Sequence, residues 1–264
     1  MKLGNIAATL LVTVTAFAAG LPSAYGLEPR HQRPPQDFRK EKPMAVTNGA
    51  FGLVFGYVNS LYRTKEWVSG DVSRTPSLNG FNIGLDYDFS LIRNTLYFQV
   101  GLNYTYLNDS YVKNVVGIDY TGDWNEHYLN LPIRVKCDFR VHEKIRLFAY
   151  AGPTISQGLS SKLSYRGRVG EAAVGYSYNY FNGKSSVTGT LDEAAKPIFE
   201  GMVPDNAYRS FDVLMGGAIG AEFLNLIEVS VGYDGGLVNK IRKSKDSGNN
   251  CHRHQFYVNL GFRF

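Results

Sequence analysis

Long apolar segments are scarce in this chain of 264 residues. The longest apolar run, Ile6–Ala19 near the N-terminus, is short, and no other run reaches the roughly 18 apolar residues that a membrane-spanning helix needs. Cysteine is scarce too, because Cys137 and Cys251 are the only two. The first absence excludes a membrane protein built of helices. The second limits the chain to one disulfide bridge at most.

The N-terminal run has the features of a secretory signal peptide. Lys2 supplies a positive start, Ile6–Ala19 supplies the apolar stretch, and Ala24-Tyr25-Gly26 fits a small-x-small cleavage site. We therefore expect residues 1–26 to be a cleavable signal peptide. Residues 27–50 carry four prolines, mixed charges and few large apolar groups, and we expect a flexible periplasmic lead-in there.

The charge balance argues against a nucleic-acid partner. Lys and Arg total 28 against 23 Asp and Glu, which gives a formal net charge of +5, and the basic residues are dispersed along the chain. The composition is 14% aromatic with 28 glycines, which is typical of a β-barrel.

The last ten residues, Gln255–Phe264, alternate strictly between apolar and polar side chains. Phe256, Val258 and Leu260 fall on one parity with two further phenylalanines, while the other parity is polar or small. Because a strand turns successive side chains to opposite faces, this segment has one fully apolar face. Its length suits a tilted strand that crosses the hydrocarbon layer. The segment therefore predicts a transmembrane β-strand.

Alternation of the same kind recurs through the chain. We expect eight strands, at Phe51–Tyr62, Leu78–Phe89, Thr95–Leu107, Glu126–Val141, Lys144–Ser161, Ser210–Phe223, Leu226–Gly236 and Gln255–Phe264.

The connections between these segments alternate in length. Ser90–Asn94, His142–Glu143 and Leu224–Asn225 are short, whereas the connections between them are long. Short periplasmic turns and long outer loops are the pattern of a bacterial outer-membrane barrel. The sequence thus predicts an all-β fold over 51–264, an eight-stranded antiparallel up-and-down transmembrane β-barrel with long extracellular loops. The predicted long loops are Arg63–Ser77, Asn108–Asn125, Lys162–Arg209 and Leu237–His254.

Aromatic residues mark both predicted rims. Phe89, Phe139, Phe223 and Phe264 stand at the short-turn rim, and Tyr62, Tyr106, Tyr128 and Tyr233 at the long-loop rim.

In this arrangement the two cysteines lie at opposite ends of the barrel, whereas a disulfide joins Cα atoms only about 6 Å apart. We predict no bridge.

The strand Tyr128–Lys136, with the sequence YLNLPIRVK, is similar to the signature strand of the PorT-like outer-membrane β-barrel family of Bacteroidetes-type bacteria. The resemblance runs from Phe51 to Phe264, with Cys137 as a departure where an aromatic is expected. The resemblance implies an outer-membrane barrel without assigned chemistry. The family's name-giving member has a role in secretion and gliding, but no residue of this chain indicates that role. Similar family motifs stand at Tyr150–Pro153, Asp212–Gly216, Gly220–Glu222 and Tyr233–Leu237.

Charged residues occupy the inward parity of the predicted barrel. An eight-stranded barrel leaves only enough interior for side chains, and buried charges must be paired. We expect these charges to form a salt-bridge plug. Because glycines lie on the same face, a narrow gated conduit is one alternative, and a small-ligand cavity is another. The predicted network is Asp86, Asp88, Arg134, Lys136, Asp138, Arg140, Arg146, Asp212, Glu222, Glu228, Asp234 and Arg263.

Two segments carry residues of chemical interest. Cys251–His254 offers a thiol and two imidazoles to a soft metal, but it lacks a fourth ligand. His127 stands near Ser and Asp residues of neighbouring loops, as an acyl-transfer base would, yet no Ser, His and acid share an informative spacing. We predict no catalytic residue, no metal and no cofactor.

The long third loop is the predicted functional surface. Gly175–Phe181 alternates as a hairpin beyond the membrane would, and residues 191–202 suggest a short helix. Tyrosine with arginine is typical of recognition surfaces. We expect a non-catalytic structural or surface-recognition protein that contacts outer-membrane lipid and another envelope protein or a glycan. A small channel or secretion-associated barrel is the alternative, and a lipid-modifying enzyme is less favoured. The predicted recognition residues are Tyr165, Arg166, Arg168, Tyr176, Tyr178, Tyr180 and Phe181.

Overall fold

The computed structural model describes residues 49–64, 77–115, 118–142, 144–169, 172–189, 208–241 and 251–264, all within the compact unit Thr47–Phe264. The expected signal peptide, residues 27–48 of the expected lead-in and the expected short helix lie outside the described residues, whereas Gly49 and Ala50 belong to β1. The strands are β1 (Gly49–Thr64), β2 (Ser77–Ile92), β3 (Leu96–Val115), β4 (Ile118–His142), β5 (Ile145–Val169), β6 (Ala172–Asn179), β7 (Lys184–Gly189), β8 (Phe211–Phe223), β9 (Ile227–Gly236) and β10 (Cys251–Arg263).

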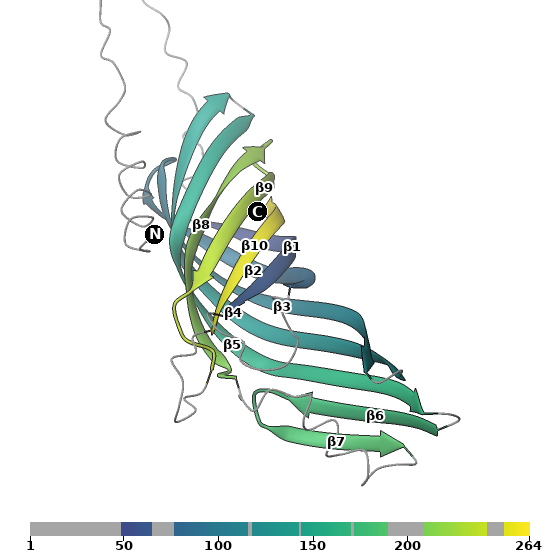
Figure 1. Ribbon diagram of the computed structural model, residues 1–264. Coiled ribbons are helices and arrows are strands. Elements are labelled where there is room, and N and C mark those ends of the chain that lie inside the picture. Colours follow the sequence, from purple (N-terminus) through teal and green to yellow (C-terminus); the bar gives the residue numbers. More distant parts are fainter. Residues whose placement is uncertain are drawn as a thin grey trace, which may run out of the picture. The chain divides into compact units, whose positions relative to one another are not determined.

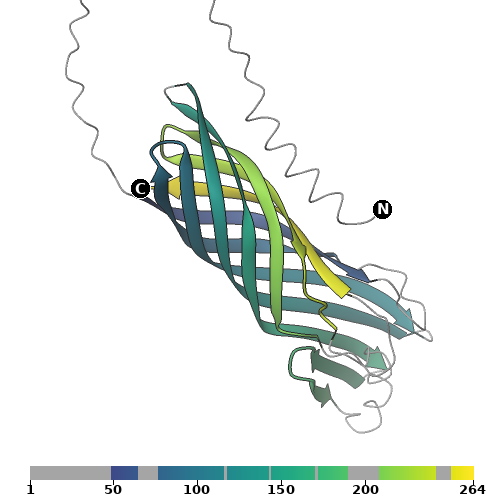
Figure 2. The ribbon, with the colours of Figure 1, turned by 90° about the vertical axis from the view of Figure 1, so that its left-hand side faces the viewer.

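Eight of these strands close a ring. Each pairs antiparallel with its neighbours in the order β4-β3-β2-β1-β10-β9-β8-β5, and β4 also pairs with β5. β6 and β7 continue the sheet from β5 and lie outside the ring (Figure 1). Figure 2 shows the closed cylinder from the side, with β6 and β7 at one end. The predicted eight-stranded antiparallel barrel is confirmed.

Strand alternation decides which side chains face the bore. On β1, Phe51, Leu53 and Phe55 are exposed, whereas Val54 and Val58 are buried. The same alternation gives the other barrel strands exposed apolar side chains on the outer face and buried polar ones on the inner face. The outer surface therefore carries an apolar belt. Among the described residues, no helix is long and apolar enough to cross a membrane.

The short turn predicted at Leu224–Asn225 is confirmed. In the turn between β8 and β9, Leu224 and Asn225 have φ values of 58° and 56°, and the Leu226 amide donates to the Phe223 carbonyl at 3.0 Å. Positive φ at both central residues is the type I′ arrangement, whose twist matches that of the flanking strands.

The prediction that Asn108–Asn125 is a long loop is wrong. β3 and β4 remain paired from Asn108–Asn125 out to Val115–Ile118. β3 parts from β2 at Asn108, and β5 parts from β8 at Gln157, but β5 continues along β4 and then β6. In this extension the apolar residues, such as Trp124 and Leu163, face inward and the outward residues are polar, so the outward-apolar pattern used to predict the membrane strands ends before it. We call this extension of β3, β4 and β5, together with β6 and β7, the outer wall.

A β-bulge at Leu159 changes the inward parity of β5. The register steps from Tyr128–Gly158 to His127–Ser160, which leaves Leu159 without a partner on β4. Even-numbered residues face inward before the bulge, and odd-numbered residues such as Ser161 face inward after it. A bulge of this kind reassigns every later side chain to the other face.

Candidate functional site

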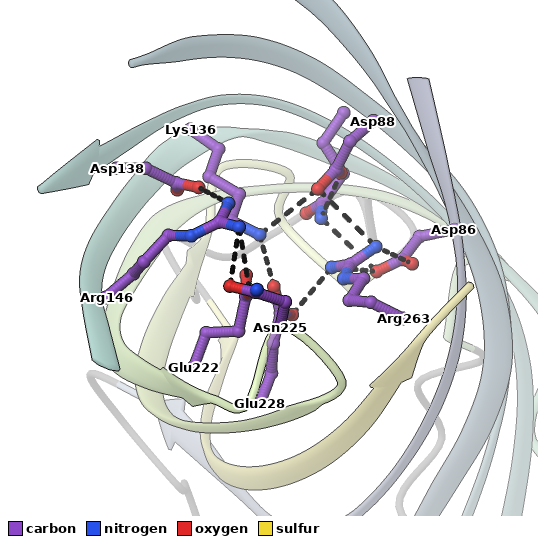
Figure 3. Close-up of polar contacts among 10 residues, drawn as sticks. Asp86, Asp88, Lys136, Asp138, Arg146, Glu222, Asn225, Glu228 and Arg263 are labelled. Carbon is purple, nitrogen blue, oxygen red and sulfur yellow. Dashed lines mark hydrogen bonds and ion pairs between the residues drawn. The ribbon is translucent and has the colours of Figure 1, made fainter. Parts of the chain in front are cut away.

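Ion pairs fill the bore at the short-turn end (Figure 3). The Arg263 guanidinium donates to Asp86 Oδ1 at 2.5 Å and to Glu228 Oε2 at 2.7 Å. Lys136 Nζ pairs with Asp88 Oδ2 at 3.1 Å and also contacts Glu228. Because these residues come from β2, β4, β9 and β10, the network ties opposite sides of the barrel together.

Arg146 extends this network toward the rim. It lies 3.6 Å from Glu222 and 3.9 Å from Asp138, and it donates to Asn225 Oδ1 at 2.7 Å. Asp138 Oδ1 is buried without a hydrogen-bond partner. These pairs are therefore looser than those of Arg263. We call the whole group the inner plug: Asp86, Asp88, Lys136, Asp138, Arg146, Glu222, Glu228 and Arg263.

Three predicted members of the charge network, Arg134, Asp212 and Asp234, lie elsewhere in the bore. Arg134 packs over the Tyr150 ring, 4.5 Å from its centroid, and its guanidinium is 3.8 Å from Asp234. Asp212 is fully buried 3.7 Å from Arg253, toward the outer end. The structure thus brings these two acids to separate partners, not to one continuous network.

Arg140 lies outside the network. Its side chain is exposed at the short-turn rim, and its register partner is Arg146. The prediction that Arg140 is an interior charge was wrong, because β3 pairs with β4 only as far as Cys137, so at Arg140 one side of β4 has no neighbouring strand and the side chain reaches solvent. No ion pair is formed by it among the described residues.

A small polar cavity occupies the middle of the bore. Its volume is about 20 Å³, enough for a water molecule, and Arg134 and Asp234 contribute to its lining. Amide side chains form much of the rest. Side-chain oxygens of Asn82, Asn103, Asn130 and Thr154 are buried there without hydrogen-bond partners.

Aromatic rings close the outer end of the bore. Trp124 stacks on Tyr62 with centroids 5.5 Å apart, and Tyr208 stacks on Tyr180 at 4.8 Å. Tyr62 and Tyr128 are fully buried. The prediction that these two tyrosines mark the outer rim was therefore wrong, because their even-numbered positions face inward on β1 and β4.

Two charged residues lie beneath these rings. Glu126 accepts hydrogen bonds from Ser161 at 2.7 Å and Tyr128 at 3.0 Å, and also from the Tyr62 hydroxyl. Arg253 lies over the Tyr128 ring at 3.9 Å. The sequence predictions missed both charges, although Glu126 shares the parity of Lys136 and Arg253 shares that of Arg263. Glu126 begins the predicted strand Glu126–Val141, so its parity alone would have placed it inside, and parity extended two residues before the predicted strand Gln255–Phe264 would have placed Arg253 there.

Lys240 completes this end of the bore from the segment between β9 and β10. Its side chain is fully buried, with Nζ 5.3 Å from the Tyr128 centroid and 5.4 Å from that of Phe181. Nζ has no hydrogen-bond partner. Burial, with repulsion by Arg253, lowers the pKa of Lys240 to about 8. The outer plug comprises Tyr62, Trp124, Glu126, Tyr128, Tyr180, Phe181, Tyr208, Lys240 and Arg253.

The residues predicted to form a recognition loop are mostly inside. β6 and β7 form the expected hairpin, but Tyr165, Tyr176, Tyr180 and Phe181 are buried, because the Leu159 bulge and the outer wall turn them toward the bore. Tyr178 is partly buried and Arg166 is exposed. Arg168 is paired in the wall opposite Ala173. The tyrosine-rich surface expected from the sequence is therefore absent from the exposed face of the described wall.

The segment Cys251–His254 belongs to β10 and not to a loop as predicted. Cys251 and Arg253 face the interior, and the two histidines alternate to the outer face. Alternation therefore separates the thiol from both imidazoles. No cluster of three metal-ligating side chains occurs within the described residues. Cys137 and Cys251 are both free.

His127 lies on the outer face of β4. Its Nδ1 is 2.6 Å from the Tyr104 hydroxyl, and its ring is 5.1 Å from that of Tyr106. In the part of the chain described here, no serine hydroxyl or carboxylate is hydrogen-bonded to it. The geometry of an acyl-transfer base with its nucleophile and acid is not assembled around it.

No protein-family model and no curated protein matches the chain. Similar solved structures are outer-membrane proteins. Ail, the attachment invasion locus protein of Yersinia pestis in complex with the heparin analogue sucrose octasulfate, is 13% identical, with coverage of 82% of this chain and 99% of Ail and a TM-score of 0.40. Neisserial surface protein A is 11% identical, with coverage of 81% and 99% and a TM-score of 0.37.

The outer membrane enzyme PagL is 13% identical, with coverage of 78% of this chain and 97% of PagL and a TM-score of 0.37. Both enzymes and proteins without a named activity thus occur among the similar structures. At such identities and scores the likeness supports no argument about activity, and the fold rests on the strand pairing itself.

Proposed function

We propose that this protein is a bacterial outer-membrane barrel of the PorT-like type whose bore is closed and whose outer wall serves as a non-catalytic surface. The observation that supports this most strongly is the filling of the bore. The inner plug, the small cavity lined by Arg134 and the outer plug follow one another along the bore, and the cavity has room for little more than water. A closed bore leaves the outside of the barrel as the working surface.

The apolar belt supports a membrane location. Exposed side chains such as Phe55, Leu85, Val135 and Leu260 face outward from four different strands. A surface of that kind is stable in a hydrocarbon layer and unstable in water. The short turns at one end and the long wall at the other match periplasmic and extracellular sides, respectively.

A small gated channel is the second candidate. The feature that favours it is the polar cavity near Arg134, where the unpartnered amide oxygens would hold water. Such a channel would require both plugs to move, since each closes the bore on its own side of the cavity.

Planar-bilayer conductance of the refolded protein tests the proposal. Folding is first verified by heat-modifiable migration on a gel. We expect no discrete currents at either polarity, because ion pairs and stacked rings block the bore. Stable unitary currents from the unaltered protein would contradict the closed barrel and support the channel.

A further inference from the structure

The outward face of the outer wall carries mostly polar side chains. Strand pairing places its residues in three rows that run across β3, β4, β5, β6 and β7. We call this array the polar wall face. Its rows are Asn108–Asn125–Lys162–Asn179–Lys184, Ser110–Asp123–Ser164–Ser177–Ser186 and Val112–Thr121–Arg166–Gly175–Thr188.

The polar wall face has an excess of positive charge. Lys162, Arg166 and Lys184 are exposed, and none of them forms an ion pair with any described residue. The one acid in the three rows is Asp123, which already accepts a hydrogen bond from Ser110 at 2.7 Å. The face is therefore complementary to a ligand with several negative charges.

The spacing of the cations suits a saccharide that carries anionic groups. Neighbouring strands lie about 4.8 Å apart, so Lys162 and Lys184, two strands apart, are separated by about 10 Å. Lys162 and Arg166 are four residues apart on β5, or about 13 Å. Amides and hydroxyls, including the Ser177–Ser186 pair at 2.8 Å, fill the intervals and offer hydrogen bonds to sugar hydroxyls.

The position of the face identifies the source of that saccharide. On the same outward side of β4, the exposed Leu129 belongs to the apolar belt, His127 follows with its Tyr104 contact, and Asn125 begins the polar rows. The side chains thus pass from apolar through amphipathic to polar within about 13 Å along the strand. That order matches hydrocarbon, interface and headgroup in one leaflet.

We propose that the polar wall face binds the anionic sugar headgroups of glycolipids in the leaflet that surrounds the barrel. Lys162, Arg166 and Lys184 contact phosphate or carboxylate groups, and the amides and hydroxyls between them contact the sugars. This inference rests on the proposed membrane location, but it does not depend on whether the bore is closed.

The test uses the full barrel in nanodiscs that contain phosphorylated lipopolysaccharide or its dephosphorylated form. Native mass spectrometry counts the glycolipid retained per barrel as the ionic strength rises. We expect at least a tenfold preference for the phosphorylated form at low salt, weakened at high salt by screening. The variant with Lys162→Gln, Arg166→Gln and Lys184→Gln should lose this preference.

A matched control removes three exposed cations from the short-turn end, by Arg93→Gln, Arg140→Gln and Lys144→Gln. The control should retain the preference of the unaltered protein. Equal retention of both glycolipids, an unaffected wall variant, or an equal loss in the control would overturn the proposal. So would stronger binding of soluble heparin than of the glycolipid, which would indicate a ligand outside the membrane.

Membrane insertion, scored by heat-modifiable migration and protease protection, separates this failure from that of the proposed function. An inserted barrel without glycolipid preference refutes only the inference. A chain that does not insert refutes the membrane location and the inference together, and an inserted barrel that conducts refutes only the closed bore.

Discussion

The inner and outer plugs close the same bore with different chemistry. The inner plug is mostly charge, with Arg263 and Lys136 held among carboxylates on opposite strands. The outer plug is mostly aromatic, and its buried cations Lys240 and Arg253 lie against ring faces. A cation stabilises the first plug by neutralising acids, whereas in the second plug the Lys240 ammonium loses its hydration without gaining a hydrogen bond.

This difference predicts opposite outcomes when a cation is removed. The largest effect is expected for Arg263→Met in the inner plug. The change leaves Asp86, Asp88 and Glu228 close together with Lys136 as their remaining strong partner, so the free energy of unfolding should fall by about 3–5 kcal/mol.

Urea unfolding of the barrel in lipid vesicles measures this change. Arg140→Met, which removes an exposed cation at the same end, is the control and should alter the free energy by no more than about 0.5 kcal/mol. Equal changes in the free energy of unfolding for the two variants would show that the inner ion pairs stabilise the barrel no more than an exposed cation does.

Lys240→Met should have a smaller effect of the opposite sign. The folded protein holds the pKa of Lys240 near 8, below its usual range, so the unfolded chain binds more protons between pH 8 and the normal lysine pKa of about 10.4. The stability of the unaltered protein should therefore rise with pH across this window. Because the change removes a buried ammonium that has lost its hydration, we expect the methionine variant to gain on the order of 1 kcal/mol at pH 7.

The same unfolding assay, repeated from pH 7 to 10.5, follows this slope. The methionine variant should show a flatter dependence on pH. Lys144→Met, an exposed lysine at the other end, serves as the control and should leave the slope unchanged. A less stable Lys240→Met protein at pH 7 would mean that the ring contacts outweigh the cost of burying the ammonium.

Much of the inner plug was predictable because a strand has a side-chain period of two. Asp86 and Asp88 on β2, and Lys136 and Asp138 on β4, alternate with apolar residues, and this alone placed them in the bore. The pairing partners were not predictable, since the stagger between strands decides which acid meets which base.

The outer plug was largely missed for two physical reasons. Beyond the apolar belt the alternation of β4 and β5 reverses, because Trp124 and Leu163 face inward and the outward residues are polar, so the outward-apolar pattern of a membrane strand no longer applies there. The bulge at Leu159 then turned Tyr165 inward, against the parity read from the first half of β5. A single unpaired residue thus moved an expected surface into the interior.

Two plugs in series are the central claim, and conductance of plug variants tests it most directly. One variant removes the inner trio together, by Asp88→Ser, Lys136→Ser and Glu228→Ser, so that the charges removed cancel in part and Arg263 keeps Asp86 as its partner. Another variant carries Trp124→Ser and Tyr208→Ser. The account predicts no currents from either variant and unitary currents from the combination, because each plug alone still blocks the bore. Currents from one plug variant alone, or none from a correctly folded combination, would contradict it.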